Sequence, residues 1–247
     1  MGWGDDVLTT GIVKRAYARH GVPVCVGDGK VRWSVIFDGN PKIAKVPGKE
    51  SLWVRSFEGR RPYIDYAKSD SSHYAWVRHF RAEPGELYLS VEEIAPYRRY
   101  GGYVYIEPNC KGEITENKDW GFEKWQAVVE GLPEIRFVQG PGKRLKGVEQ
   151  VETPSFRHAC GLLSACAFFV GTDGGLHHAA AALGKPAVVV WGGYASPENL
   201  GYSSQVNLCE TKRWCGERKS CDHCRKALDA VKVERVIAEV KKLERDI

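Results

Sequence analysis

Residues 167–191 constrain the fold of this chain more than any other stretch. An apolar run at 167–170 enters a glycine-rich turn that carries Asp173, and a helix of small residues follows. The tripeptide Gly-Lys-Pro at 184–186 ends the helix, and a second apolar run occupies residues 187–191. A strand, a helix and a second strand in this order predict one βαβ step of a parallel sheet.

The turn of this βαβ step is a candidate site for an anion. It joins the carboxyl end of a strand to the amino end of a helix, where backbone N–H groups lack partners and the helix dipole is positive. Gly174 and Gly175 carry no β-carbon that would keep a ligand away. The turn therefore predicts a phosphate site. The alternative is structural, because small residues also let a helix pack closely on its sheet.

The rest of the chain extends this pattern in two parts. Residues 97–102 are charged, aromatic and end in glycine, so we place an interdomain linker there, with domains at 1–98 and 99–247. The second part alternates strands and helices, which predicts a doubly wound parallel sheet. In the first part we expect a helix over 5–20, strands at 22–26, 35–37 and 52–54, and a short helix at 74–80. In the second part we expect strands at 103–107, 135–139 and 148–151, helices over 120–130 and 155–165, and one final helix over 225–247.

Three segments resemble glycosyltransferase family 9, the heptosyltransferase-like family. The run V-G-T-D-G-G-L-H-H-A-A-A-A-L-G-K-P at 170–186 resembles the family's donor-binding signature G-x-D-[TS]-G-x-x-H-[LA]-A-A-A-L-G-x-P. Residues 2–10 resemble its amino-terminal G-x-G-D-x-x-L loop, and residues 117–125 resemble the segment in which a lysine precedes the first donor-domain helix. Gly174 departs from the signature, which mostly has Thr or Ser there, so one hydroxyl that could bind phosphate is missing.

The resemblance implies an α/β fold of two Rossmann-like domains that face a cleft, the GT-B architecture. The amino-terminal domain is reduced, because about 100 residues is small for it and no strand precedes the loop at 2–6. We therefore expect either a reading frame that extends upstream with an apolar strand, or a loop that is poorly ordered.

The resemblance also implies an inverting glycosyltransferase. Such an enzyme moves a sugar from a nucleotide-diphosphate-sugar donor to a hydroxyl of a glycan, a lipid core or another acceptor. Asp5 matches the family's catalytic base; Asp6 is the rival, and either could simply cap the first helix. Lys118 would pair with the donor phosphates, so that no cofactor is required. His177 is expected to be exposed. The implied donor-binding residues are Asn109, Lys118, Thr172, Asp173, Gly174, Gly175 and His178.

Four cysteines near the carboxyl terminus form a separate candidate site. Cys221 and Cys224 have half of a zinc-site spacing, whereas Cys209 and Cys215 do not supply the second C-x₂-C. A structural zinc site, reduced thiols and a disulfide all stay open. The scattered cysteines are expected to be core or near-core thiols; they are Cys25, Cys110, Cys160 and Cys166.

The composition limits the class of protein but does not identify its function. Hydrophobic residues make up 43% of the 247 residues, and no apolar run approaches the ~20 residues of a membrane span. With no visible secretory signal, a cytoplasmic location is expected. The formal net charge is +5, and residues 1–100 hold 16 Lys and Arg against 12 Asp and Glu. This bias fits an anionic acceptor, a nucleic acid or an ordinary surface.

Two other functions stay open. A non-catalytic nucleotide-sugar-binding module fits the missing strand and the departure at Gly174. A nucleic-acid-modifying glycosyltransferase fits the basic first part and the cysteines. The donor base, the sugar and the acceptor are not determined by the sequence.

Overall fold

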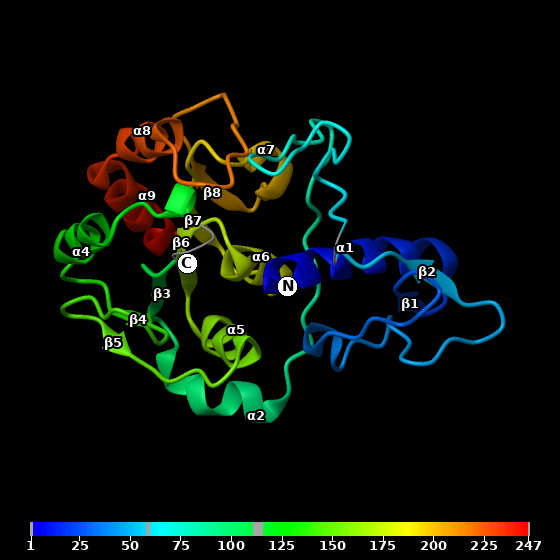
Figure 1. Cartoon of the computed structure of the whole chain (residues 1–247). Coiled ribbons are helices and arrows are strands. Elements are labelled where there is room, and N and C mark those ends of the chain that lie inside the picture. Colours follow the sequence, from blue (N-terminus) through cyan, green and yellow to red (C-terminus); the bar gives the residue numbers. More distant parts are fainter. Residues whose placement is uncertain (1, 58–59, 111–115, 247) are drawn as a thin grey trace.

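The computed structural model describes residues 2–57, 60–110 and 116–246. These residues form two parallel sheets, one of six strands and one of two (Figure 1). Within the same ranges, no helix has both the length and the apolar character that crossing a membrane requires.

The larger sheet has the strand order β5-β4-β3-β6-β7-β8, with every neighbouring pair parallel. Counted from its first strand this is the order 3-2-1-4-5-6 of a doubly wound Rossmann-like sheet, as the sequence predicts. The strands are β3 (Val104–Glu107), β4 (Phe137–Gln139), β5 (Glu149–Gln150), β6 (Phe168–Thr172), β7 (Ala187–Val190) and β8 (Gln205–Leu208). The helices are α4 (Phe122–Glu130), α5 (Phe156–Ala165), α6 (Gly175–Ala182), α7 (Pro197–Leu200), α8 (Asp222–Ala230) and α9 (Val233–Arg245).

Apolar side chains from both faces of this sheet form its core. One face packs on α4, α8 and α9 around the fully buried Trp120 and Trp125, and the other packs on α5 and α6. Burying these large rings removes apolar area from water, which is the main favourable contribution to folding.

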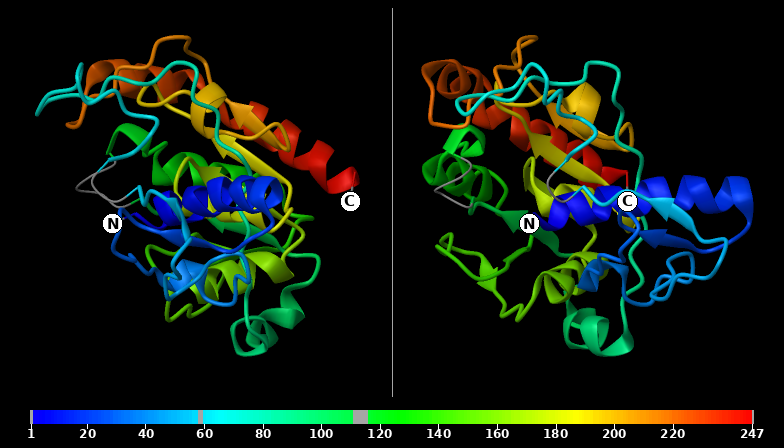
Figure 2. Two further views of the ribbon diagram at one scale, coloured as in Figure 1. Left: turned by 90° about the vertical axis from the view of Figure 1, so that its right-hand side faces the viewer. Right: turned by 45° about the vertical axis from the view of Figure 1, so that its right-hand side comes forward.

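The smaller unit is built on α1 (Trp3–His20), which ends at Gly21 with φ +71°. Its sheet pairs β1 (Val24–Val26) with β2 (Leu52–Val54). One face of α1 packs on these strands through Val7 and Val13, while Leu8 joins the core of the larger sheet. The helix is therefore shared by both units, and Figure 2 shows it (dark blue) extending from the larger unit along the smaller one. The remaining elements are η1 (Val35–Phe37), α2 (Val91–Ile94), η2 (Ala95–Tyr100) and η3 (Glu116–Lys118).

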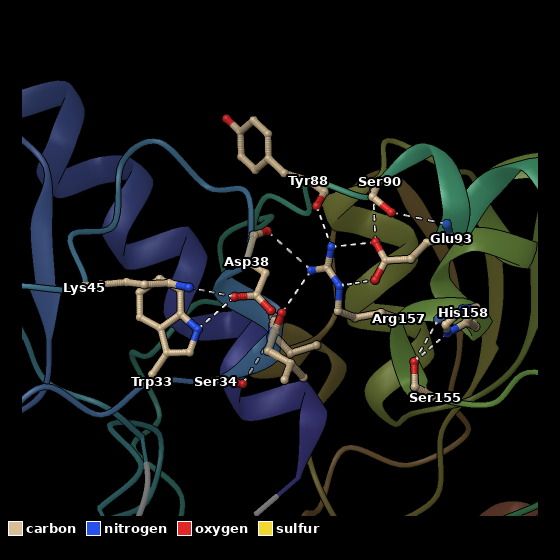
Figure 3. Close-up of polar contacts among 12 residues, drawn as sticks. Trp33, Ser34, Asp38, Lys45, Tyr88, Ser90, Glu93, Ser155, Arg157 and His158 are labelled. Atoms are coloured by element: carbon tan, nitrogen blue, oxygen red, sulfur yellow. Dashed lines mark hydrogen bonds and ion pairs between the residues drawn. The ribbon is translucent and has the colours of Figure 1, made fainter.

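One buried arginine joins the two units. Arg157 on α5 is 7% exposed, and each of its five N–H groups has an acceptor. Nε and Nη2 donate to the carboxylate of Glu93 at 2.5 and 2.7 Å, and Nη2 also donates to the carbonyl of Tyr88 at 2.7 Å. Nη1 donates to the carbonyls of Val35 and Asp38 at 3.0 and 3.5 Å (Figure 3). Arg157 thus fixes η1 against the larger unit.

Three expected elements take another form. Residues 35–37 are a 3₁₀ helix rather than a strand, because the Ser34 hydroxyl accepts from the N–H of Ile36 at 3.3 Å and turns the chain. Residues 74–80 are not a helix; Trp76 bridges Ile64, and Val77 N–H donates to Tyr63 O at 2.9 Å.

The expected final helix is two helices, α8 and α9. The chain breaks between them because the Trp120 indole N–H donates to the carbonyls of both Leu228 and Val231, each at 3.1 Å. Two ends of the first domain also differ from expectation. The loop at residues 2–6 is the first turn of α1, and the linker at 97–102 overlaps η2, where Tyr97 and Tyr100 are buried. The boundary at 98/99 stays a prediction.

Replacing Arg157 tests the connection between the units. Arg157→Met leaves Glu93 without its cation and removes the guanidinium hydrogen bonds to the carbonyls of Val35, Asp38 and Tyr88, so the free energy of unfolding should fall by about 3–5 kcal/mol in urea denaturation. Arg15→Ala is the control, because it removes an exposed ion pair with Glu83 and should change that free energy by less than about 1 kcal/mol. Equal effects of the two changes would contradict the interpretation.

The same variant has a pH signature. The hydrogen bonds from Arg157 lower the pKa of Glu93, so this contribution is present above pH ~4.3 and is lost as pH falls through the lowered pKa. Arg157→Met should lack that part of the acid-induced loss of stability.

Candidate active site

The site lies at the switch point of the larger sheet. The chain leaves β3 toward β4 and β5 and returns on the other side as β6, so the loops after β3 and β6 diverge at neighbouring carboxyl ends. Ligands of doubly wound sheets bind at such a point. The expected donor-binding residues follow these two strands: Asn109 and Lys118 after β3, and 172–178 at the end of β6 and the start of α6.

An ion pair connects the two loops. Lys118 Nζ lies 2.5 Å from Asp173 Oδ2, and the Asp173 side chain is 4% exposed. Burial raises the pKa of Asp173, while the charge of Lys118 opposes that shift. The ammonium also lies 5.3 Å from the centre of the Tyr194 ring. Lys118 therefore lies at the turn after β6, where Asp173 is its partner.

His177, which the sequence suggested was exposed, is buried and shapes the same turn. Its Nδ1 accepts from the N–H of Gly174 at 2.8 Å, and its Nε2 lies 3.1 Å from the carbonyl of Leu200. Burial lowers the pKa of His177 to about 4, so the ring is neutral at pH 7 and can make both contacts. The Gly174 N–H, expected to face phosphate, is therefore already bonded.

The remaining residues of the turn have mixed contacts. Thr172 Oγ1 lies 3.4 Å from Cys110 Sγ. His178 Nδ1 lies 2.7 Å from the Tyr202 hydroxyl, and the two histidine rings are 3.8 Å apart. A β-carbon on Gly4 would lie 2.9 Å from the His178 ring, so His178 packs directly under the first turn of α1. The amino ends of α1 and α6 therefore meet at the site.

Gly174 and Gly175 differ in what surrounds them. A β-carbon on Gly174 would meet no atom within 4 Å, so this position is open. A β-carbon on Gly175 would lie 3.0 Å from the Phe156 ring, which stacks on Trp3 at 5.8 Å. Only Gly174 thus leaves space at the turn, whereas Gly175 permits close packing.

Asn109, in the loop after β3, is bonded to the loop that follows β4. Its Oδ1 accepts from the N–H of Lys143 at 2.9 Å, and its Nδ2 lies 3.4 Å from the Lys143 carbonyl. Its own N–H donates to Glu107 at 2.9 Å, and burial raises the pKa of Glu107 to about 7. Glu107 was not expected from the sequence, because a glutamate at the end of a strand gives no pattern.

Asp5 is held in the first turn of α1. Its Oδ2 accepts from Arg61 Nε at 2.9 Å, and its Oδ1 accepts from the Tyr63 hydroxyl. Asp6, the rival base, is 1% exposed and accepts from Ser34 Oγ at 2.7 Å, which ties α1 to η1. Asp6 therefore contacts η1 of the smaller unit, whereas Asp5 contacts the segment that carries Arg61 and Tyr63.

An aromatic cluster links Asp5 to Lys118. The Tyr63 ring lies 6.2 Å from Trp76, and Trp76 lies 5.2 Å from Tyr194, the ring beside Lys118. None of these three rings was expected at the site from the sequence. Aromatic residues outside a motif give no indication of which segment they will contact, so the sequence offered no signal for these rings.

The structure groups three of the four candidate cysteines. The sulfurs of Cys215, Cys221 and Cys224 all lie within 4.8 Å of one another, with Cys215 at 3.8 Å from Cys221 and 3.2 Å from Cys224. The hydrogen bond between the sulfurs of Cys215 and Cys224 lowers the pKa of Cys215. Cys209 lies outside the group, with its sulfur 3.6 Å from the Thr211 carbonyl.

The loop that carries Cys215 and Cys221 is attached to the segment that carries Lys118. The Asn117 side chain donates to the carbonyls of Glu217 and Lys219 at 2.8 and 2.7 Å, and accepts from Cys221 N–H at 3.0 Å. Since Asn117 precedes Lys118, these bonds connect the position of the lysine to the cysteines. The scattered cysteines lie as expected: Cys25, Cys160 and Cys166 are buried and Cys110 is partly buried.

The smaller unit has a basic hollow at the carboxyl ends of β1 and β2. Three arginines and one aspartate contribute to its lining, and Arg60, one of these arginines, is adjacent to the Asp5 partner Arg61. The lining residues are Gly27, Asp28, Arg32, Arg55, Ser56 and Arg60.

The sequence model of glycosyltransferase family 9 (heptosyltransferase) matches residues 44–231, more than half of the chain. The chain belongs to glycosyltransferase family 9. Among curated proteins, none matches it significantly.

Solved structures agree with this membership in their fold. A family 9 glycosyl transferase from Veillonella parvula DSM 2008 is 13% identical with a TM-score of 0.68, over 100% of this chain and 95% of that one. The iron-containing dodecameric glycosyltransferase TibC from enterotoxigenic E. coli H10407 is 17% identical with a TM-score of 0.68, over 100% and 74%. The E. coli ADP-heptose lps heptosyltransferase II is 16% identical with a TM-score of 0.51, over 66% and 54%. The chain spans about half the length of that heptosyltransferase. These likenesses show the fold, which is GT-B with a reduced amino-terminal unit.

The two glycines of the turn should respond oppositely to substitution. Gly174→Ser introduces a side chain into open space at φ −179°, so the free energy of unfolding should stay within about 0.5 kcal/mol of the parent. Gly175→Ala forces a β-carbon against Phe156 and should lower the free energy of unfolding by about 1–3 kcal/mol, despite the better helix propensity of alanine. Thermal and urea denaturation measure both, and a stabilised Gly175→Ala variant would contradict the packing argument.

Proposed function

We propose that this protein transfers a sugar, with inversion, from a nucleotide-diphosphate-sugar donor to an acceptor hydroxyl. The observation that carries the proposal is the Lys118–Asp173 ion pair at the switch point, beside the amino end of α6. A cation beside a helix amino end is suited to a diphosphate leaving group.

On donor binding, Lys118 would exchange its contact with Asp173 for a contact with the donor diphosphate. Asp173 now neutralises the lysine in a buried place, and a diphosphate would offer it more negative charge at the same position. The Thr172 hydroxyl and the first turn of α6 would contribute hydrogen-bond donors. Asp173 would then be available to accept from sugar hydroxyls or to orient the turn.

Asp5 would act as the base. As the acceptor oxygen bonds to the anomeric carbon, its proton passes to the Asp5 carboxylate, and the bond from that carbon to the diphosphate breaks with its electron pair leaving on the phosphate. The attack and the departure take place on opposite faces, which inverts the anomeric centre.

The donor nucleotide has one candidate to test first. The E. coli heptosyltransferase II of similar fold is an ADP-heptose enzyme, so we propose an ADP-sugar. The arginines of the basic hollow support an acceptor with an anionic group. A cytoplasmic location stays a prediction.

Two substitutions separate donor binding from chemistry. Lys118→Ala should weaken ADP binding by about 1–3 kcal/mol in calorimetry, because a charged contact to the phosphates is lost. Asp5→Asn should bind ADP like the parent and yet release no ADP from ADP-heptose, because an amide cannot accept the proton. The exposed Lys226→Ala is the control for the loss of one charge. Normal turnover by Asp5→Asn together with inactive Asp6→Asn would instead assign the base to Asp6, and ADP binding without turnover by the parent would indicate a non-catalytic module.

We also propose that Cys215, Cys221 and Cys224 hold a structural metal ion. Sulfurs at ~2.3 Å from one tetrahedral metal lie about 3.8 Å apart, and the observed separations of 3.8 and 3.2 Å fit closure around an ion. Zinc is the metal that the sequence suggests, whereas TibC is an iron-containing glycosyltransferase. In either case the ion would stabilise the loop that Asn117 ties to Lys118.

Metal content and its removal test this site. Elemental analysis should find about one zinc or iron per chain in the parent and in Cys209→Ser, but not in Cys224→Ser. Chelation should lower the melting temperature and weaken ADP binding, because the loop behind Lys118 loses its support. A metal-free parent, or metal retained by Cys224→Ser, would contradict the proposal.

A further inference from the structure

Asp5 is held by two side chains that follow it by more than 50 positions. The Tyr63 hydroxyl donates to Oδ1, and Arg61 Nε donates to Oδ2 at 2.9 Å. The Asp5 side chain is 8% exposed and that of Arg61 is 32% exposed. Each carboxylate oxygen therefore has one donor from the same segment.

These two donors keep their protons. Burial and the charge of Asp5 raise the pKa of Tyr63 well above its usual value, so its hydroxyl stays protonated at any physiological pH. A guanidinium is likewise always charged. A carboxylate has about four lone-pair directions, so two donors leave a second lone pair on each oxygen for a proton.

The surrounding contacts hold Tyr63 in place. Its ring packs against Phe57 at 6.2 Å, Trp76 at 6.2 Å and Phe80 at 5.6 Å. Its carbonyl accepts from the N–H of Val77 at 2.9 Å. This segment is in turn fixed to α7, where Asn199 Nδ2 donates to the carbonyl of Phe80 at 2.7 Å. A hydroxyl held this firmly determines the orientation of the carboxylate that it contacts.

We propose that Arg61 and Tyr63 are positioning residues of the transfer reaction. They fix the plane of the Asp5 carboxylate through one hydrogen bond to each oxygen, so that a remaining lone pair meets the acceptor hydroxyl in a reactive geometry. This inference rests on the proposed function, in which Asp5 is the base. Neither residue contacts the reacting atoms in this scheme; both act through Asp5.

The test separates positioning from donor binding. The probes are ADP, for affinity by calorimetry, and ADP-heptose, for the rate of ADP release with water as acceptor. Tyr63→Phe should keep the melting temperature and ADP affinity near the parent values, and should lower kcat by about 10- to 100-fold without raising KM for ADP-heptose. Arg61→Met should lower kcat similarly, and Arg61→Lys should restore part of it, because an ammonium replaces the charge but not the planar geometry.

Matched controls come from elsewhere in the chain. Tyr103→Phe removes a hydroxyl from a ring that packs on Tyr100, and Arg98→Ala removes an exposed charge. Both should turn over like the parent.

Three outcomes would overturn the inference. Parent-like kcat in Tyr63→Phe and Arg61→Met would make these contacts structural only, and an equal loss of ADP affinity and kcat would place the residues in donor binding. A parent protein that releases no ADP would refute the proposed function, and the positioning role with it. If Tyr63→Phe fails to fold, the comparison of Arg61→Met with Arg61→Lys decides the question.

Discussion

The guanidinium of Arg157 is the contact on which the arrangement of the two units depends. It neutralises Glu93 and donates to carbonyls at both ends of η1, so the smaller unit cannot rotate away without breaking these hydrogen bonds and leaving the buried guanidinium without part of its acceptors. The Ser34–Asp6 hydrogen bond connects η1 to α1, so the position of η1 also fixes that of α1. The position of Asp5 at the donor half follows from these two contacts and from the packing of α1 on α6.

Close packing of two helix ends brings the halves of the site together. Gly4 and Gly175 bear no β-carbons where α1 crosses α6, and His178 fills the space beneath them. The residues of the site therefore divide into two kinds. Gly175, His177 and His178 build the turn, whereas Lys118, Asp173 and Asp5 carry charge, Lys118 paired with Asp173 and Asp5 paired with Arg61.

The sequence predicts the larger sheet well and the smaller unit poorly. Strands β3, β4, β6 and β7 and helix α6 follow from apolar runs bounded by glycine and proline, since a parallel sheet buries both faces of its strands. Residues 35–37 and 74–80 were assigned wrongly because short aromatic and apolar runs fit several conformations. There the outcome depends on Ser34 and on the pairing of Trp76 with Ile64. The break between α8 and α9 depends on Trp120, a residue more than 100 positions away.

The sequence by itself determined the family and the doubly wound sheet, because these depend on local order and residue type. Only the tertiary structure decided the partners of each charge. Asp173 meets Lys118, Asp5 meets Arg61 and Tyr63, and three cysteines meet without the fourth, through contacts that span up to 58 positions. Such contacts result from how separate elements pack, and no local pattern encodes them.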